Sequence, residues 1–503
     1  MAGAASGRHT GQVPSTSSSG RIVAAVPPRP AEFARRIRTA RMTVAEHRAA
    51  GRSARSGMPL AAHAEIGTAV RDPVLLLEEQ AVTRVPQLVP IRYGRMLANP
   101  FTFLRGAARV MAVDLGGGPH SDLHVQLCGD AHLSNFGFYT TPERQQAFDI
   151  NDFDETHPGP FEWDVKRLAA SVATSGLING FTPKKARAAA LAAVTGYRME
   201  IGRLADLGNL AVWYSHQEVE RMLSDIRDEA GDVAAHRLTA EVAKARFHDS
   251  NHALRKLCAT VDGQVQFRNE PPLIIPAEDL LPAWGQSVED SYDLISRLVR
   301  SYRAGLQSDR RHLFDRFTVV QLGFKLVGVG SVGTRAYVLL LDGAGHDDPL
   351  ILQAKEAQRS VLADQVPVAA DRQPGEGDRV VHGQRLLQMT SDIFLGAVRA
   401  TGVDGVRRDF YVRQLRDGKG AVDVDGLRPR AMGFYGRVCG QTLARAHARS
   451  GDRAAIAGYL GDRSVFDESV ADFAMSYAER SAADHAALRR AVDTGRVSAR
   501  EGV

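Results

Sequence analysis

Residues 128–135 read Cys128-Gly129-Asp130-Ala131-His132-Leu133-Ser134-Asn135, directly after an apolar segment that we expect to end a strand at 123–128. A carboxylate, an imidazole and an amide therefore lie together on one loop. Asp130 can accept the proton of a substrate hydroxyl, and the amide oxygen of Asn135 can bind a hard metal ion. The alternative is a polar turn in which both side chains only satisfy backbone groups, and this segment alone leaves the choice open.

A second polar loop follows an expected strand at 147–150. It reads Asn151-Asp152-Phe153-Asp154-Glu155, and with Asp149 it places four acids within seven residues. Carboxylates packed so densely need cations or donors nearby, and Mg²⁺ is bound by one or two carboxylates together with substrate phosphates. An exposed acidic turn is the alternative, but the apolar neighbours Phe148 and Phe153 argue against full exposure.

A glycine-rich segment, Gly328-Val329-Gly330-Ser331-Val332-Gly333, lies among short apolar runs expected to be strands at 317–320, 325–330, 336–341 and 350–354. A dinucleotide-binding fold would need a helix after the glycines. Here a strand follows instead, and a glycine loop between two strands is how kinases cover the phosphates of ATP. A glycine-rich hairpin that binds nothing is the alternative.

Lys355 stands at the end of the apolar strand 350–354, 22 residues after Gly333, and is one of only eight lysines in the chain. Kinases carry their phosphate-pairing lysine on the strand that follows the glycine hairpin. The alternative is a lysine that extends from a strand end into solvent. The acids that follow Lys355 offer no convincing partner for it.

Together these motifs resemble the protein-kinase-like superfamily, nearest its aminoglycoside and small-molecule phosphotransferase branch. The first loop matches that branch at Gly, Asp, His and Asn, with Cys128 in place of a leading histidine. The segments 128–136, 151–156, 161–169 and 410–417 resemble more specifically the bacterial family called domain of unknown function 2252, over roughly residues 70–455. That family name implies no activity.

The kinase resemblance implies a role for each motif residue. Asp130 would be the catalytic base and His132 would support its geometry, with Asn135 and Asp152 as metal ligands and Asp154 as a possible second carboxylate. The phosphates of ATP would be held by Gly328, Gly330, Gly333 and Lys355. Asp164 is similar to a buried aspartate that hydrogen-bonds the catalytic loop. The implied cofactors are ATP and Mg²⁺.

The order of the motifs departs from that of kinases, because the glycine loop and Lys355 follow the catalytic loop by about 200 residues and no lysine precedes Lys166. We therefore expect an α+β, two-lobed kinase-like fold that is circularly permuted, with strand 410–415 leading to a helix at 432–449 that returns to the large lobe. Permutation is tolerated where the original termini lie close together. A separation of more than about 15 Å between Lys355 and Asp152 would exclude this fold, since both must reach one nucleotide.

The expected organisation has five parts. They are a disordered N-terminus at 1–30, an Arg-rich helical arm at 31–72, a helical lobe at 73–310, a β-rich nucleotide-binding lobe at 311–425, and C-terminal helices at 426–503 that pack on the helical lobe.

Composition limits the class of protein. The 503 residues are 44% hydrophobic and 24% charged, which is ordinary for a globular chain. A formal charge of +5 is too small over this length to indicate nucleic-acid binding. Three distant cysteines and the lack of any long apolar run favour a cytoplasmic protein without disulfides or membrane spans.

These observations favour an ATP- and Mg²⁺-dependent phosphotransferase whose hydroxyl acceptor, a small molecule or a protein, is not identified. One alternative is a nucleotide-binding protein of pseudokinase type that regulates a partner. The other is a metal-dependent phosphohydrolase, which lacks the further His and Asp clusters of a two-metal site.

Overall fold

The computed structural model describes residues 42–502 except 69, 247–249, 263, 281–286, 327, 329, 331, 345–347, 369–374, 402–404 and 416–418. The expected disorder at 1–30 and the first part of the expected arm lie outside these residues. The remainder of the arm contains helix α2 (Val44–Ala54), which packs on α18 (Arg453–Leu460). A Cβ on Gly51 would lie 1.8 Å from the carbonyl oxygen of Ala455, so only glycine permits this contact.

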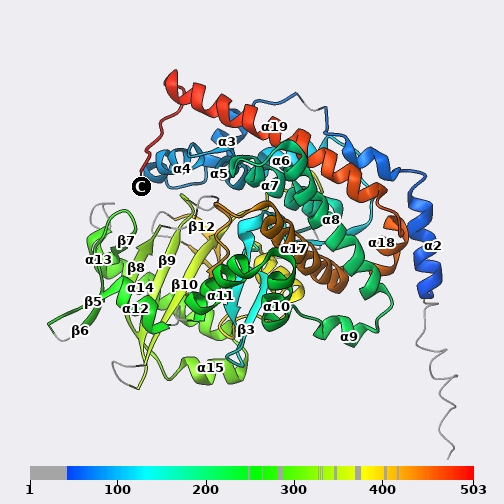
Figure 1. Ribbon diagram of the computed structural model, residues 1–503. Helices are drawn as coiled ribbons and strands as arrows, with labels where there is room; N and C mark the ends of the chain where they lie inside the picture. Colours follow the sequence, from blue (N-terminus) through cyan, green and yellow to red (C-terminus); the bar gives the residue numbers. More distant parts are fainter. Residues whose placement is uncertain are drawn as a thin grey trace, which may run out of the picture. The chain divides into compact units, whose positions relative to one another are not determined.

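The fold is α+β, with helices and several antiparallel sheets, as expected (Figure 1). A first group of helices precedes the loop at 128–135: α3 (Pro73–Ala81), α4 (Val89–Met96), α5 (Pro100–Gly106) and α6 (Ala108–Gly116). The periodicity at 101–115 predicts one helix here, but the chain breaks at Ala107 (φ −109°, ψ 37°). At this break, Arg167 donates a hydrogen bond to the Leu104 carbonyl at 2.9 Å, and Arg92 donates one to the Gly106 carbonyl at 2.8 Å.

Two small sheets position the two motif loops. One pairs β1 (His124–Leu127) with β4 (His157–Pro160), and the other has the order β13-β2-β3, with β2 (Phe136–Thr140), β3 (Gln146–Ile150) and β13 (Gly420–Ala421). The loop 128–135 joins β1 to β2, and the loop 151–156 joins β3 to β4. The two loops therefore emerge side by side, because each connects the same pair of sheets.

The large sheet has six strands in the order β11-β12-β10-β9-β8-β7, and every neighbouring pair is antiparallel. Its strands are β7 (Ile274–Pro276), β8 (Thr318–Lys325), β9 (Ala336–Asp342), β10 (Pro349–Ala357), β11 (Gly396–Thr401) and β12 (Arg407–Gln414). The strand expected at 317–320 is the first part of β8, which has an irregularity between Val319 and Gln321 and ends at Lys325. The strand expected at 325–330 is not found among the described residues of that range. The polar Gln321 tolerates the strand interior because its side chain accepts a hydrogen bond from the Phe267 amide at 2.6 Å.

Helices pack against this sheet, and several of them precede residue 311 in the chain. The helix α16 (Glu376–Leu387) lies between β10 and β11 in the chain, and α12 (Ser250–Leu257) and α14 (Val288–Gly305) pack on β10 and β11. The large sheet includes β7, which precedes residue 311 in the chain. The remaining elements near it are β5 (Cys258–Val261), β6 (Gln264–Phe267), α13 (Ala277–Leu280) and α15 (Ser308–Phe314).

The helical half is built around four helices: α7 (Glu162–Ile178), α8 (Pro183–Ala205), α17 (Pro429–Ser450) and α19 (Val465–Asp493). They match the helical segments expected from the sequence. Small residues let α17 and α8 approach closely, and a Cβ on Gly440 would lie 2.0 Å from the carbonyl oxygen of Ala193. Beside them run α9 (Asn209–Tyr214), α10 (Val219–Ala230) and α11 (Asp232–Arg246).

The chain crosses between the halves after β12. Strand β13 pairs with β2, with Gly420 opposite Phe138 and Ala421 opposite Gly137, and α17 then enters the helical core. Among the described residues, none of the helices combines the length and apolar character needed to cross a bilayer.

Candidate functional site

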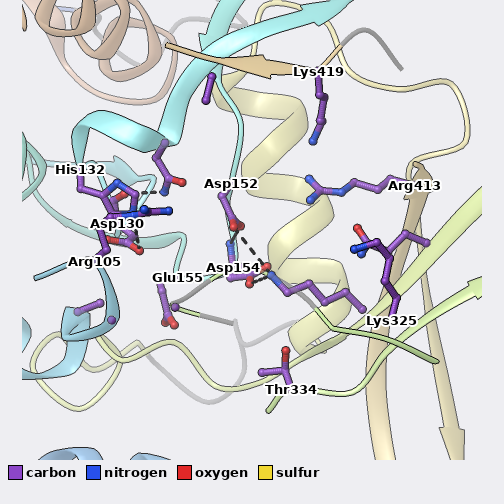
Figure 2. Close-up of a pocket in the computed structure, with 18 of the residues that line it drawn as sticks. Arg105, Asp130, His132, Asp152, Asp154, Glu155, Lys325, Thr334, Arg413 and Lys419 are labelled. Atoms are coloured by element: carbon purple, nitrogen blue, oxygen red, sulfur yellow. Dashed lines mark hydrogen bonds and ion pairs between the residues drawn. The ribbon is translucent and has the colours of Figure 1, made fainter. Parts of the chain in front are cut away.

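A cavity of about 500 Å³ lies where the two halves meet, and it is lined by residues from both (Figure 2). Of the residues expected to form the site, those that line the cavity are Asp130, His132, Asn135, Asp152, Asp154, Gly328, Gly330 and Lys355. Gly333 is the exception and lies behind the cavity wall. Segments about 200 positions apart in the chain therefore contribute to one pocket.

Asp164 on α7 holds the first motif loop, residues 128–135, through hydrogen bonds to the loop backbone. Its carboxylate accepts hydrogen bonds from the amides of Cys128 and Gly129, at 2.8 and 3.1 Å, and lies 3.2 Å from His447 Nε2. Asp164 is almost fully buried. These bonds are the ones expected for this residue, and they fix the loop backbone immediately before Asp130.

Gly129 makes the close approach of the two motif loops possible. Its φ is +84°, and a Cβ there would lie 2.1 Å from the carbonyl oxygen of Glu155. Any other residue would be strained by the backbone angle and would push the second loop away.

Asp130 faces the cavity with a cation behind it. Arg167 Nε donates to its carboxylate at 2.5 Å, His132 Nε2 lies 3.6 Å from the other oxygen, and the Asn135 side-chain amide donates to the Asp130 carbonyl at 2.6 Å. Burial raises the pKa of Asp130 above its usual value, although Arg167 opposes the shift. Burial also lowers the pKa of His132 well below its usual value, so this imidazole is neutral.

Lys355 meets the second motif loop. It forms an ion pair with Asp154, and its Nζ lies 3.8 Å from an oxygen of Asp152. Burial would lower the pKa of Lys355, but the two carboxylates outweigh it and raise the value. Asp152 and Asp154 are therefore the acidic partners of Lys355. Both precede Lys355 by about 200 positions, so the residues after Lys355 could not reveal them.

Both Asp152 and Asp154 line the cavity, but Asp154 has more hydrogen-bonding partners and is the less exposed of the two. Asp154 also accepts a hydrogen bond from the Tyr411 hydroxyl at 2.6 Å, and Tyr411 sits opposite Lys355 in the β10–β12 pairing. Burial would raise the pKa of Asp154, but Lys355 and Tyr411 hold it well below its usual value. The Asp152 side chain keeps 34% of its surface exposed.

Helix α16 is tied to the same loop through Arg379. Its guanidinium donates to the carbonyls of Asp154, Thr156 and Gln358, at 2.9, 2.6 and 2.7 Å. Glu155 accepts from the Val361 amide at 2.8 Å, and burial raises its pKa to about 7. The acidic loop is thus held in place by hydrogen bonds from the half of the protein that carries the large sheet.

The glycine segment is held from outside by Arg84. Its guanidinium donates to the carbonyls of Val332 and Gly330, at 2.5 and 3.0 Å, and the Val85 amide donates to the Gly333 carbonyl at 2.8 Å. Gly333 has a φ of +92°, and a Cβ there would lie 3.0 Å from the Arg84 side chain. Gly328 and Gly330 face the cavity in front of this contact.

A comparison with protein-family models finds one match over residues 84–491, to the family described as an uncharacterized protein conserved in bacteria (DUF2252). The chain belongs to this family. The match covers most of the DUF2252 chain, including Arg84, all the motif residues and the C-terminal helices. Neither the curated proteins nor the solved structures yield a match.

The donor set of the DUF2252 cavity fits a hard metal ion that takes most of its ligands from phosphate and water. Asp152 and Asn135 both offer oxygen atoms to the cavity. Among the described residues, no group of three or more His, Cys, Asp or Glu could hold a metal by itself.

The site also contains residues that lie outside the sequence motifs. Tyr411 and Arg413 lie on the expected strand 410–415, and alternation along that strand could have indicated that both face Lys355. Lys419, next to the crossing, has a pKa that burial lowers to about 7. Arg84 and Arg105 carry no sequence signal, because they are two arginines among many.

Proposed function

We propose that this protein is a kinase-like phosphotransferase that moves the γ-phosphoryl group of ATP, with Mg²⁺, to a hydroxyl acceptor. The observation that carries the proposal is the meeting of Lys355 with Asp152 and Asp154 in a cavity that also contains Asp130, Asn135 and the glycine segment. Phosphoryl transfer needs a phosphate-pairing cation, metal-binding oxygens and a base at one place.

The order of parts in the large sheet supports a permuted kinase-like fold. The glycine segment joins β8 to β9, Lys355 lies on the next strand, β10, and helix α16 follows before β11 and β12. Kinases arrange their glycine loop, lysine strand and following helix in this sequence. The distance of 3.8 Å between Lys355 and Asp152 satisfies the requirement that both reach one nucleotide.

Each residue has a chemical task in this proposal. Lys355 pairs with the phosphates once a nucleotide competes for it, and Asp130 accepts the proton of the acceptor hydroxyl. Asp152 and Asn135 would hold the metal ion, which supplies charge neutralisation at the phosphates. Asp154 is already bound by Lys355 and Tyr411, so it orients Lys355 and contributes less to metal binding.

Thermal unfolding with Mg²⁺ and ATP tests this proposal. Ligand at 100 times its dissociation constant should stabilise the wild-type protein by about 2.7 kcal/mol. Asp152→Asn should abolish the metal-dependent part of this shift, whereas Asp232→Asn, which changes an acid that is 92% exposed, should not. Release of ADP in the presence of candidate hydroxyl compounds then tests turnover.

The outcomes separate the alternatives. Binding that depends on Asp152 but never leads to ADP release would replace the enzyme with a nucleotide-binding regulator. No stabilisation by any nucleotide would overturn the proposal altogether. Metal-dependent phosphate release from substrates other than nucleotides would favour a phosphohydrolase.

A further inference from the structure

Arg105, at the C-terminal end of α5, is a cation in the cavity wall without a hydrogen-bonding partner among the described residues. Its Nε is buried and makes no hydrogen bond, and its guanidinium carbon lies 6.0 Å from the centre of the Phe101 ring. A buried guanidinium nitrogen without an acceptor is costly, and an anion in the cavity would supply acceptors for this side chain. Guanidinium groups match carboxylates and phosphates geometrically.

Arg105 lies at the end of the cavity where the proposed function places the hydroxyl of the acceptor. Figure 2 shows Arg105 beside Asp130 and His132, on the side of the cavity opposite Lys325 and Arg413. The electrostatic interaction between Arg105 and Asp130 is attractive. Asp130 is the proposed base, so the group that Arg105 reaches lies next to the hydroxyl that is to be phosphorylated.

At the Asp130 end of the cavity, one carboxylate faces two guanidinium groups, Arg105 and Arg167. Among these three groups, one positive charge is left over. This excess of positive charge beside Asp130 suits an anion.

We propose that the acceptor carries an acidic group, a carboxylate or a phosphate monoester, beside its reactive hydroxyl, and that Arg105 binds this group. The inference rests on the proposed function and specifies its substrate class. Transfer itself is unchanged: the acceptor oxygen bonds to the γ-phosphorus, the bond from that phosphorus to the bridging oxygen of ADP breaks, and Asp130 takes the hydroxyl proton.

Matched probes test the assignment. Glycerol 3-phosphate and glycerol share hydroxyl groups and differ in the acidic group. Their binding to the complex of the protein with Mg²⁺ and a non-hydrolysable ATP analogue is measured by calorimetry for the wild type, Arg105→Gln, Arg105→Lys and Arg109→Gln. Arg109 is the control, since it does not line the cavity and its guanidinium is already paired with Glu79 and Asp364.

The wild type and Arg109→Gln should bind glycerol 3-phosphate at least tenfold more tightly than glycerol. Arg105→Gln should lose roughly tenfold to a hundredfold of affinity for the phosphate compound only, and Arg105→Lys should retain part of it. Affinity for the ATP analogue should be unchanged. Equal binding of the two probes by the wild type, or unchanged phosphate binding by Arg105→Gln, would overturn the assignment.

A second titration distinguishes failure of the proposed phosphotransferase function from failure of the anion site at Arg105. If the ATP analogue does not bind the wild type, inorganic phosphate is titrated into the wild type and Arg105→Gln without nucleotide. If Arg105→Gln binds phosphate more weakly than the wild type, the anion site at Arg105 is supported and only the phosphotransferase function is rejected. Equal binding would reject both.

Discussion

Lys355 on β10 forms an ion pair with Asp154, which lies 201 positions earlier in the chain, on the loop after β3. The pair joins the half of the protein that carries the large sheet to the helical half at the floor of the cavity. Nearly all of the Lys355 side chain is buried, whereas Asp152 beside it remains partly exposed. Because of this difference in exposure, we expect substitution of Lys355 to destabilise the fold and substitution of Asp152 to leave its stability nearly unchanged.

Asp152→Asn should leave the free energy of unfolding of the ligand-free protein within about 0.5 kcal/mol of the wild-type value, because the side chain is partly exposed and its contact with Lys355 is long. The same variant should lose Mg²⁺-dependent nucleotide binding. Urea unfolding and calorimetry measure the two quantities. Intact Mg²⁺-dependent binding in this variant would remove Asp152 from the metal site.

Lys355→Met should destabilise the protein by about 3–5 kcal/mol, because it leaves two carboxylates facing each other without their cation. Urea unfolding of this variant checks the size of the effect. The double variant Lys355→Met with Asp154→Asn should recover part of the loss, since it removes the less exposed of the two charges. A loss below about 1 kcal/mol in the single variant would show that the ion pair is not a structural link.

Asp164→Ala should destabilise the protein by about 2–5 kcal/mol, because it leaves the buried amides of Cys128 and Gly129 without an acceptor. Chemical denaturation measures this effect. Asp164→Asn keeps an acceptor and should lose less. Equal stability of the alanine variant and the wild type would mean that the loop does not depend on this carboxylate.

Glu155 should make stability depend on pH. Burial raises its pKa from 4.5 to about 7 in the folded protein, so between these values the folded state binds more protons than the unfolded state. Its contribution is therefore fully present below about pH 4.5 and is lost as the pH rises through about 7. Glu155→Gln should flatten this part of the profile and stabilise the protein at pH 8 by on the order of 2 kcal/mol.

Unfolding by urea at pH 5.5, 6.5, 7.5 and 8 checks the Glu155 prediction. The glutamine still accepts from the Val361 amide, so the comparison isolates the charge. A variant whose stability follows the wild-type profile in parallel would contradict the raised pKa.

Arg84→Ala should loosen the glycine segment, because it removes both side-chain hydrogen bonds to the carbonyls of Gly330 and Val332. Amide hydrogen exchange in peptides covering 326–335 should become faster, and nucleotide affinity should fall roughly tenfold. Arg109→Ala is the matched control on a neighbouring helix. Exchange that is as slow in Arg84→Ala as in the wild type would mean that the backbone bond from Val85 to Gly333 and the apolar contacts of Val332 hold the segment without Arg84.

Local pattern was sufficient for much of the fold. The helices around 166–177, 184–204 and 432–449 and the strands at 336–341 and 350–354 were predicted near their observed positions, because their apolar periodicity is long and regular. The single helix predicted at 101–115 was wrong, because Arg167, from a distant helix, competes for a backbone carbonyl at its break. No pattern local to 101–115 records that competitor.

What the sequence determined by itself was the chemistry of each motif: an Asp, His and Asn loop after a strand, an acidic loop after another, a glycine segment between strands, and a rare lysine at a strand end. Each depends only on residues close together in the chain. The tertiary structure alone decided that Asp154 is the partner of Lys355, that Arg84 holds the glycine segment and that Arg105 faces the cavity with no hydrogen-bonding partner in the part of the chain that the structure describes. These contacts join segments far apart in the chain, and the packing of the two halves selects them.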